Sequence, residues 1–210
     1  AMDLLMTRRS SPVRRSLLVA ALAMGLVGCD RISGAGKPAF KAIDVTGAEY
    51  ARGFSLPDAD GTVRTLADFK GKVVVVFFGY TQCPDVCPTT MTELAQVKRS
   101  LGADGARVVG VFISVDPERD TGELLKAYMA NFGADFVGLR GTPEQIAQAA
   151  KEFKVFFAKV PGKTETSYTV DHTAGSYVFD AQGRIRLFTR YGSGAKALAD
   201  DLKLLLAETT

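Results

Sequence analysis

Two of the three cysteines, Cys83 and Cys87, lie four positions apart in the stretch FFGYTQCPDVCPTTM. An apolar run ends just before them, and Pro88 suits the first turn of a helix. Unpaired amides and the helix dipole lower the pKa of a thiol near a helix N-terminus, so we expect both sulfurs to be available as thiolates. Thiolates attack disulfides and bind soft metal ions such as Cu(I) or Zn(II). The pair alone leaves disulfide exchange, peroxide reduction, a metal site and a passive crosslink open.

The elements predicted around the cysteines follow the order strand, cysteine loop, helix, strand. The run VVVVFFGY, residues 73–80, is β-branched and aromatic, which favours a central strand buried on both faces. A helix is predicted over about 88–102 and a second buried strand over 106–116. This is the thioredoxin-like arrangement, whose redox signature is C-x-x-C. The spacing here is C-x-x-x-C, and the extra residue lets both sulfurs point at one external atom.

Turn and capping signals divide the rest of the chain into further strands and helices. A strand, FKAIDV, and a hairpin turning at DADG precede the central strand. Helices are predicted to begin at Asp120 or Thr121 and at Thr142, hairpins turn at 161–162 and at DAQG, and an amphipathic helix follows them. We therefore expect an α/β, thioredoxin-like fold over residues 40–210: a mixed central sheet flanked by helices, an N-terminal hairpin, and a hairpin inserted before the histidine loop.

The N-terminal segment has the pattern of a bacterial lipoprotein signal. Residues 8–15 form a basic region with four arginines, and residues 17–27 form an apolar stretch of eleven residues. That stretch is shorter than a membrane-spanning helix of about 20 residues and fits a secretory signal. It ends in LVGC, which resembles the lipobox, where the peptide is cut before a cysteine that then carries lipid. The alternatives are an uncleaved anchor or a cut elsewhere.

We accordingly expect a signal peptide over residues 1–28, acylation of Cys29, and a flexible tether over residues 29–39. Asp30 resembles the retention signal of the inner membrane, so the expected location is the periplasmic face of the bacterial inner membrane, anchored by lipid. That compartment is oxidising, so two free thiols there need an explanation. Export by the general or the twin-arginine route stays open.

His172 is the only histidine of the chain and the candidate for a third ligand. It ends an extended segment before a predicted central strand, and in a thioredoxin-like fold that loop faces the cysteine loop. A lone histidine is usually a hydrogen-bonded surface or core residue, but this position favours a ligand. Asp171 is a candidate to orient the ring, the alternative being a solvated loop carboxylate.

The number of available ligands limits the choice of metal. A structural zinc site needs four protein ligands, whereas two cysteines and one histidine remain once Cys29 is acylated. Three ligands suit trigonal Cu(I). They also suit catalytic zinc, but no carboxylate base is placed to support that chemistry. In addition, HTAGSYVF lacks the proline that precedes the corresponding strand of thioredoxins, which argues against a plain oxidoreductase.

The charge distribution argues against a nucleic-acid partner. The net charge is +3, with 26 basic and 23 acidic residues. Residues 1–28 contain four of the basic residues and one acidic residue, so the remainder carries 22 of each and has no net charge. No basic stripe with interleaved aromatic residues is present in the sequence.

Three motifs, CPDVCPTTM, VFISVDPERDTGELLKAY and YTVDHTAGSYVFDAQGRIR, resemble the Sco (SenC) family of copper-binding, thioredoxin-like proteins. The resemblance extends over about 45–205. It implies that Cys83, Cys87 and His172 are copper ligands and that Asp116 corresponds to an acidic residue near the site, the alternative being a capping or loop aspartate. Gly122 stands where the family often has proline, which weakens a helix start without touching the ligands.

The resemblance also implies a function in the assembly of cytochrome c oxidase. Sco proteins deliver copper to the binuclear CuA centre of subunit II or reduce its cysteines. We therefore expect a membrane-tethered metallochaperone that holds Cu(I) or Cu(II) and exchanges ligands with a partner's thiolates. Subunit II, other periplasmic copper chaperones and thiol reductants are the expected partners. The oxidase served and the oxidation state transferred stay open.

Other functions of the cysteine pair compete with this one. A thiol–disulfide reductase would use both cysteines and give His172 a minor part, so whether the protein is an enzyme stays open. A peroxidase is suggested by VCPTTM, which resembles the peroxiredoxin nucleophile segment, although Cys83 is foreign to that pattern. The sequence neither supports nor excludes a copper or redox sensor, because it shows no output domain. An inert crosslink over so short a loop would stabilise little.

Overall fold

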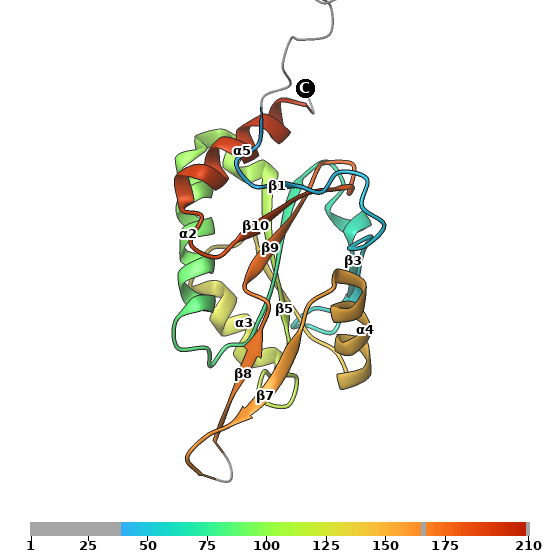
Figure 1. Ribbon diagram of the computed structural model, residues 1–210, viewed down its shortest axis with the longest axis vertical. Coiled ribbons are helices and arrows are strands. Elements are labelled where there is room, and N and C mark those ends of the chain that lie inside the picture. The colour runs from blue at the N-terminus through green and yellow to red at the C-terminus, as the bar shows by residue number, and fades with distance from the viewer. Residues whose placement is uncertain (1–38, 165–166, 209–210) are drawn as a thin grey trace, which may run out of the picture. The chain divides into compact units, whose positions relative to one another are not determined.

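The computed structural model describes residues 39–164 and 167–208, and Figure 1 shows its ribbon. The predictions for residues 1–28, for Cys29 and for the tether as far as residue 38 lie outside the described residues. Residues from Phe40 onward form one compact unit. Among the described residues, no helix is long and apolar enough to cross a membrane.

A six-stranded mixed sheet forms the centre of this unit. Its strands, in spatial order, are β1 (Ile43–Asp44), β10 (Ile185–Arg190), β9 (Gly175–Phe179), β4 (Val73–Gly79), β5 (Val108–Ser114) and β6 (Phe136–Leu139). β4, β5 and β6 are parallel, whereas β9 is antiparallel to β4 and β10 is antiparallel to β9. All residues of β4 and β5 are buried, as expected for strands covered on both faces.

Helices cover both faces of the sheet, as predicted. Within the described residues the α-helices are α2 (Val86–Ser100), α3 (Gly122–Ala130), α4 (Pro143–Phe153) and α5 (Ala195–Ala207). In Figure 1, α2, α3 and α5 lie on one side, and α4 lies on the other with β2 (Ser55–Pro57) and β3 (Val63–Thr65). Phe77 and Phe78, neighbours on β4, point to opposite faces and contact Phe112 and Phe153, respectively. This architecture confirms the predicted thioredoxin-like fold.

Most element boundaries agree with the predictions, and the differences have local causes. Thr121 caps α3 by accepting a hydrogen bond from the Leu124 amide, and Thr142 caps α4 in a capping box. α2 begins at Val86 instead of Pro88, which places Cys87 inside its first turn. Sequence patterns also missed the 3₁₀ helix η2 (Gly102–Arg107), whereas the short helical turn before β4 is η1 (Leu66–Phe69).

The predicted hairpin before the histidine is present as a separate two-stranded ribbon. Its strands are β7 (Phe157–Pro161) and β8 (Tyr168–His172), and they pair with each other outside the main sheet. The turn predicted at 161–162 falls later, because Pro161 still pairs with Tyr168. Figure 1 shows the ribbon extending from the body of the domain, with His172 at the end of β8 nearest the sheet.

Candidate metal centre

The cysteine loop joins the end of β4 to the start of α2. Gly79 ends β4, and a Cβ atom there would lie 2.8 Å from the Cys87 sulfur, so the missing side chain makes room for the thiol. Thr81 anchors the cysteine loop. Its amide and its hydroxyl donate hydrogen bonds to Asp120, the hydroxyl at 2.6 Å. Asp120 is fully buried and also accepts from the Ser114 hydroxyl at 2.6 Å, which ties the loop to the end of β5.

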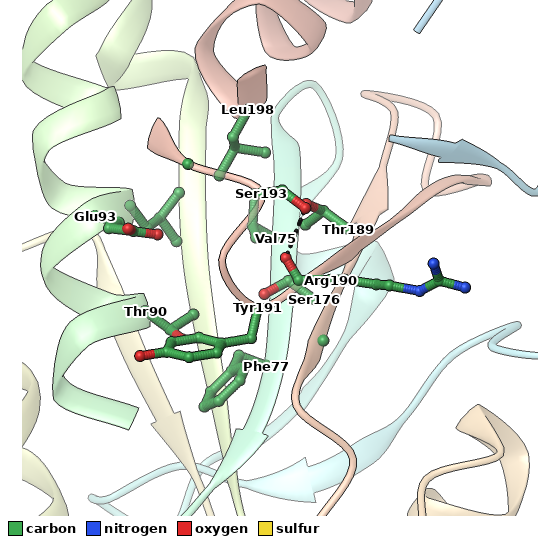
Figure 2. A pocket seen from close by; sticks show the side chains of 13 residues that line it. Val75, Phe77, Thr90, Glu93, Ser176, Thr189, Arg190, Tyr191, Ser193 and Leu198 are labelled. Carbon is green, nitrogen blue, oxygen red and sulfur yellow. Dashed lines mark hydrogen bonds between the residues drawn. The ribbon is translucent and has the colours of Figure 1, made fainter. Parts of the chain in front are cut away.

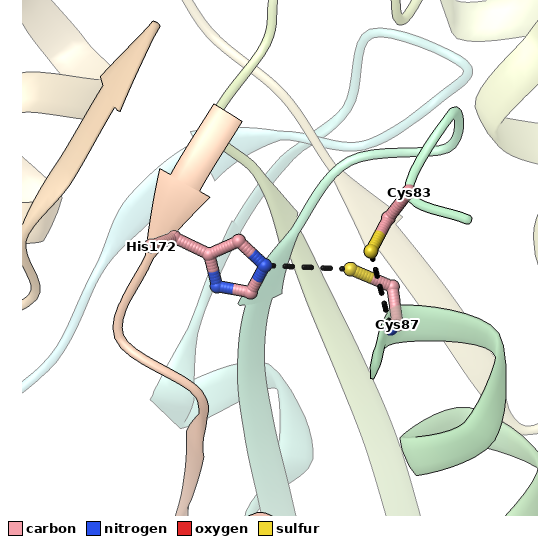
Figure 3. Close-up of side chains that lie close together, drawn as sticks. All are labelled: Cys83, Cys87 and His172. Atoms are coloured by element: carbon pink, nitrogen blue, oxygen red, sulfur yellow. Dashed lines mark hydrogen bonds between the residues drawn. The ribbon is translucent and has the colours of Figure 1, made fainter. Parts of the chain in front are cut away.

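His172 approaches the cysteines from the end of β8. Its ring lies edge-on to the rings of Phe77 and Tyr80, with centroid distances of 5.7 and 6.1 Å. Nδ1 lies 3.2 Å from the Thr173 carbonyl oxygen, which can only accept, so Nδ1 carries the proton. The lone pair of Nε2 is therefore free and lies 3.5 Å from the Cys87 sulfur (Figure 3).

The three donor atoms of Cys83, Cys87 and His172 lie within 4.8 Å of one another. No other group of three or more histidine, cysteine or acidic side chains with this proximity occurs within residues 39–164 and 167–208. Metal–thiolate bonds are about 2.3 Å long, so ligands at the corners of a trigonal site are about 4 Å apart. The donor set therefore fits a three-coordinate metal with small adjustments. Cys87 is buried, whereas Cys83 and His172 are partly exposed, which leaves one side of the site open.

The electrostatics of Cys87 differ from the prediction. Burial raises the pKa of its thiol, an effect that outweighs its position in the first turn of α2. The backbone amide of Cys87 donates to the sulfur of Cys83, 3.4 Å away, and not to the sulfur of Cys87 itself. The expectation that the helix N-terminus lowers the pKa of both thiols is thus wrong for Cys87. Both cysteines are free thiols, and metal binding at Cys87 must displace its proton.

Burial acts on His172 in the direction that favours ligation. It lowers the pKa of the imidazole, while the Thr173 carbonyl and the charge of Asp171 oppose the change. The ring therefore stays neutral to lower pH than an exposed histidine, and neutral imidazole is the form that binds metal.

Both acidic candidates lie outside the donor group. Asp171 is exposed, and Nδ1 of the His172 ring contacts the Thr173 carbonyl, so an orienting role of Asp171 stays a prediction beside the alternative of a solvated carboxylate. Asp116 is fully buried, but it belongs to a neighbouring cluster instead of the donor group: Arg119 donates to it, and so does the Tyr168 hydroxyl at 2.8 Å.

Sequence patterns also missed the groups that support the site. Asp120 was assigned to a helix cap, yet it anchors the cysteine loop, and Arg119 and Tyr168 carried no signal of their own. The run of charged residues in DPERD, directly after a buried strand, was the available signal for a cluster of buried carboxylates.

A small cavity lies beside the centre, between α2 and the ends of β9 and β10 (Figure 2). Its volume is about 30 Å³, which suits one or two water molecules. Phe77 lines it and also contacts the His172 ring.

The fold and the donor set together define a thioredoxin-like protein with a Cys-Cys-His group that could hold a metal ion. Within that class, the chain belongs to the SCO1/SenC family, whose model matches residues 44–207. The family expected from the three sequence motifs is therefore confirmed.

Individual relatives agree with this assignment. The mitochondrial SCO2 homologue of Bos taurus is 41% identical over 146 residues, which cover 69% of this chain and 54% of the bovine protein. A SCO2-like protein of Rickettsia felis is 34% identical over 71% of this chain and 74% of its own length. The chain thus spans about half of the bovine relative. The solved structure of Bradyrhizobium japonicum ScoI with copper bound is 42% identical, with a TM-score of 0.65 over 72% of this chain and 96% of that one.

Proposed function

We propose that this protein is a copper metallochaperone that holds copper at Cys83, Cys87 and His172 for the CuA centre of cytochrome c oxidase subunit II. The donor set carries the proposal: two sulfurs and an imidazole nitrogen within 4.8 Å. Thiolates select Cu(I), and imidazole also suits Cu(II). A structural zinc site would want a fourth protein ligand. The copper bound to the Bradyrhizobium relative supports copper as the cargo.

The unequal exposure of the ligands supports a route for transfer. Cys83 and His172 face the open side, whereas Cys87 is buried. An incoming thiolate can therefore replace the exposed ligands first and Cys87 last. Exchange of one thiolate for another keeps the number of sulfur ligands constant, so the metal need not be released into water. The thiol of Cys87 regains its proton as the metal leaves, because burial favours its neutral form.

Tethering would place this exchange beside its partner. We propose that acylated Cys29 anchors the domain to the periplasmic face of the bacterial inner membrane, with the residues up to 39 as a tether. The lipobox-like LVGC supports this location. Periplasmic copper chaperones would then load the site, and thiol reductants would keep its cysteines reduced.

Copper stoichiometry and transfer test the proposal. We expect the reduced protein to bind one copper per chain, to show copper–thiolate absorption in the Cu(II) form, and to load the soluble domain of subunit II. Cys83→Ser and Cys87→Ser should abolish binding, and His172→Ala should weaken it and shift the absorption. An unchanged affinity and spectrum in His172→Ala would show that the three-ligand site is wrong.

The two free thiols also support a second function, reduction of the CuA cysteines. The Cys83 thiolate would attack a partner disulfide, form a mixed disulfide and release one partner thiolate. Cys87 would then attack the Cys83 sulfur, which releases the second partner thiolate and leaves a Cys83–Cys87 disulfide. The partner gains two electrons and this protein loses two. His172→Ala distinguishes the functions: a reductase tolerates it, whereas a copper chaperone does not.

A further inference from the structure

The guanidinium of Arg119 connects three segments of the chain beside the metal centre. Nε donates to the buried carboxylate of Asp116, in the loop after β5. Nη1 donates to the Tyr168 carbonyl at 2.9 Å and to the Gln82 side chain at 3.2 Å. Tyr168 closes the cluster, because its hydroxyl donates to Asp116 at 2.8 Å. We call these four residues, Gln82, Asp116, Arg119 and Tyr168, the Arg119 cluster.

Each residue of the cluster lies at a position that matters for the ligands. Gln82 precedes Cys83 in the cysteine loop, and Tyr168 begins β8, the strand that ends in His172. Asp116 follows β5 and so belongs to the fixed framework of the sheet. Arg119 therefore links the loop that carries the cysteines, the strand that carries the histidine, and the sheet.

The strand that carries His172 needs such a link. β8 pairs only with β7 among the described strands, so no ladder of hydrogen bonds with the main sheet fixes its position. The middle of β8 is held by Val170, whose side chain is buried in the hydrophobic core and whose backbone bonds to the Tyr80 hydroxyl. The Arg119 cluster holds the beginning of β8, at Tyr168.

The packing of Arg119 makes this link specific for arginine. Its Cζ atom lies 3.6 Å from the centroid of the Tyr168 ring, so the guanidinium stacks on the ring while its edge bonds to Asp116. Nη2 is buried and has no hydrogen-bond partner among the described residues. The cation–π contact with the Tyr168 ring offsets the cost of burying this unpaired group. A lysine keeps the charge but has neither the planar face nor several fixed donors.

We propose that Arg119 is a positioning residue for the metal centre: it holds β8 against the cysteine loop so that His172 reaches Cys87. Loss of the cluster frees β8 and its histidine while the two cysteines stay on the loop and α2. The three-ligand site then becomes a two-sulfur site. The metal-dependent part of this inference rests on the proposed function, whereas the placement of His172 does not.

The first test needs no metal. In the metal-free protein, the His172 ring should show nuclear Overhauser contacts to the rings of Phe77 and Tyr80, and the β8 amides should exchange slowly. Arg119→Ala should weaken those contacts and speed exchange in β8, and Arg119→Lys should not restore them. Arg184→Ala is the matched control, because Arg184 also donates through Nε to a buried aspartate, Asp180, at the end of β9 away from His172.

The second test measures coupling between Arg119 and His172 in copper-loaded protein. Arg119→Ala should weaken Cu(II) binding by about 10- to 100-fold, the range seen when residues that orient metal ligands are removed. It should also remove the nitrogen hyperfine signal of the imidazole from the electron paramagnetic resonance spectrum. In a His172→Ala background the same change should have little further effect.

The outcomes separate this inference from the proposed function. Additive losses in the double variant, or unchanged ring contacts in metal-free Arg119→Ala, would overturn the positioning role. If the wild-type protein binds no copper, the proposed function fails, and the metal-free test still decides the role of Arg119. If Arg119→Ala does not fold, Tyr168→Phe replaces it. That variant removes the hydroxyl bond to Asp116 and keeps the stacked ring, so it should reproduce the faster β8 exchange in smaller measure, and unchanged exchange would overturn the proposal.

Discussion

The Cys87 sulfur and the His172 Nε2 atom lie 3.5 Å apart, although 85 positions separate the two residues. Metal binding at Nε2 needs a neutral ring, because an imidazolium has no lone pair to offer a metal. The Thr173 carbonyl selects the tautomer by accepting from Nδ1. The protonation state of the His172 ring therefore indicates whether Nε2 can bind a metal.

We expect the ring to titrate below pH 6.5, its ordinary value, because burial lowers the pKa of His172. The unfolded chain then binds a proton at higher pH than the folded chain. The stabilising contribution is complete above pH 6.5 and is lost as pH falls through the pKa of the folded state. Ring signals in nuclear magnetic resonance measure this directly, since the chain has one histidine. Titration at or above pH 6.5 in metal-free protein would contradict the expectation.

The two thiols should differ in reactivity in the metal-free protein. Cys87 is buried and its thiol pKa is raised, whereas Cys83 is partly exposed. Iodoacetamide should therefore alkylate Cys83 well before Cys87, because the thiolate is the reactive form. Mass spectrometry of the peptides gives the order of modification. Unfolding in urea is the control and should equalise the two rates. Faster modification of Cys87 in the folded protein would show that burial does not protect it.

The sequence predicted the parts of this fold that follow from local patterns. The apolar run that became β4, the Thr142 cap and the turn between β9 and β10 are each encoded by neighbouring residues. The proximity of Cys83, Cys87 and His172 could also be predicted, because the order of the elements places the histidine loop opposite the cysteine loop. The pKa of Cys87 was mispredicted because the burial that raises it depends on packing across the whole sheet.

Roles that depend on side-chain direction were the hardest to predict. Thr173 orients the ring through a carbonyl, a group that every residue possesses and that no sequence pattern marks. Asp116 and Asp120 lie in one short charged segment, yet one binds Arg119 and the other binds Thr81. The different roles of Asp116 and Asp120 follow only from how β5 and the cysteine loop are arranged in space.

Replacement of Gly79 by alanine should disturb the centre although no ligand is replaced. The new methyl group would lie 2.8 Å from the Cys87 sulfur and from an edge carbon of Phe77, so one of them must shift. We expect a loss of about 1–3 kcal/mol in the free energy of unfolding, together with a change in copper–thiolate absorption. Gly110→Ala is the matched control. Its methyl group would clash with the side chains of Phe136 and Leu94, so the free energy of unfolding should fall while the copper–thiolate absorption stays unchanged. A normal spectrum in Gly79→Ala would show that the contact is not needed.

Asp120 should prove to be the anchor of the cysteine loop. It accepts hydrogen bonds from the amide and hydroxyl of the partly exposed Thr81 and from the hydroxyl of the buried Ser114. Asp120→Ala removes these acceptors and leaves the buried Ser114 hydroxyl unpaired, so we expect a loss of about 1–3 kcal/mol in the free energy of unfolding. Urea unfolding measures the loss. Thr81→Val should cost less in the Asp120→Ala background than in the wild type. Strictly additive losses would show that the two residues do not act together.

The exposed aromatic residue beside the histidine should matter for a protein partner and not for a small chelator. Phe156 is 65% exposed, yet its backbone is held rigidly: its carbonyl accepts from the Thr173 amide at 2.9 Å, and its amide donates to the Thr173 hydroxyl at 3.0 Å. A protein that brings thiolates to the open side of the site must approach close to this ring, and aromatic residues are common anchors in interfaces. Phe156→Ser should therefore slow copper transfer to the soluble domain of subunit II about tenfold, the effect of about 1.4 kcal/mol of lost binding.

Transfer to a small Cu(I) chelator should be unchanged in Phe156→Ser, because the chelator needs no docking surface. Val63→Ser is the matched control: Val63 is 58% exposed on β3, which lies on the same side of the sheet as α4 in Figure 1, so its loss should leave both rates unchanged. Stopped-flow absorption of the copper–thiolate band measures both transfers. Slower transfer to both acceptors would place the effect of Phe156 in the metal centre itself, through Thr173 and His172. Equal rates for the wild type and Phe156→Ser with the protein acceptor would show that the partner docks elsewhere.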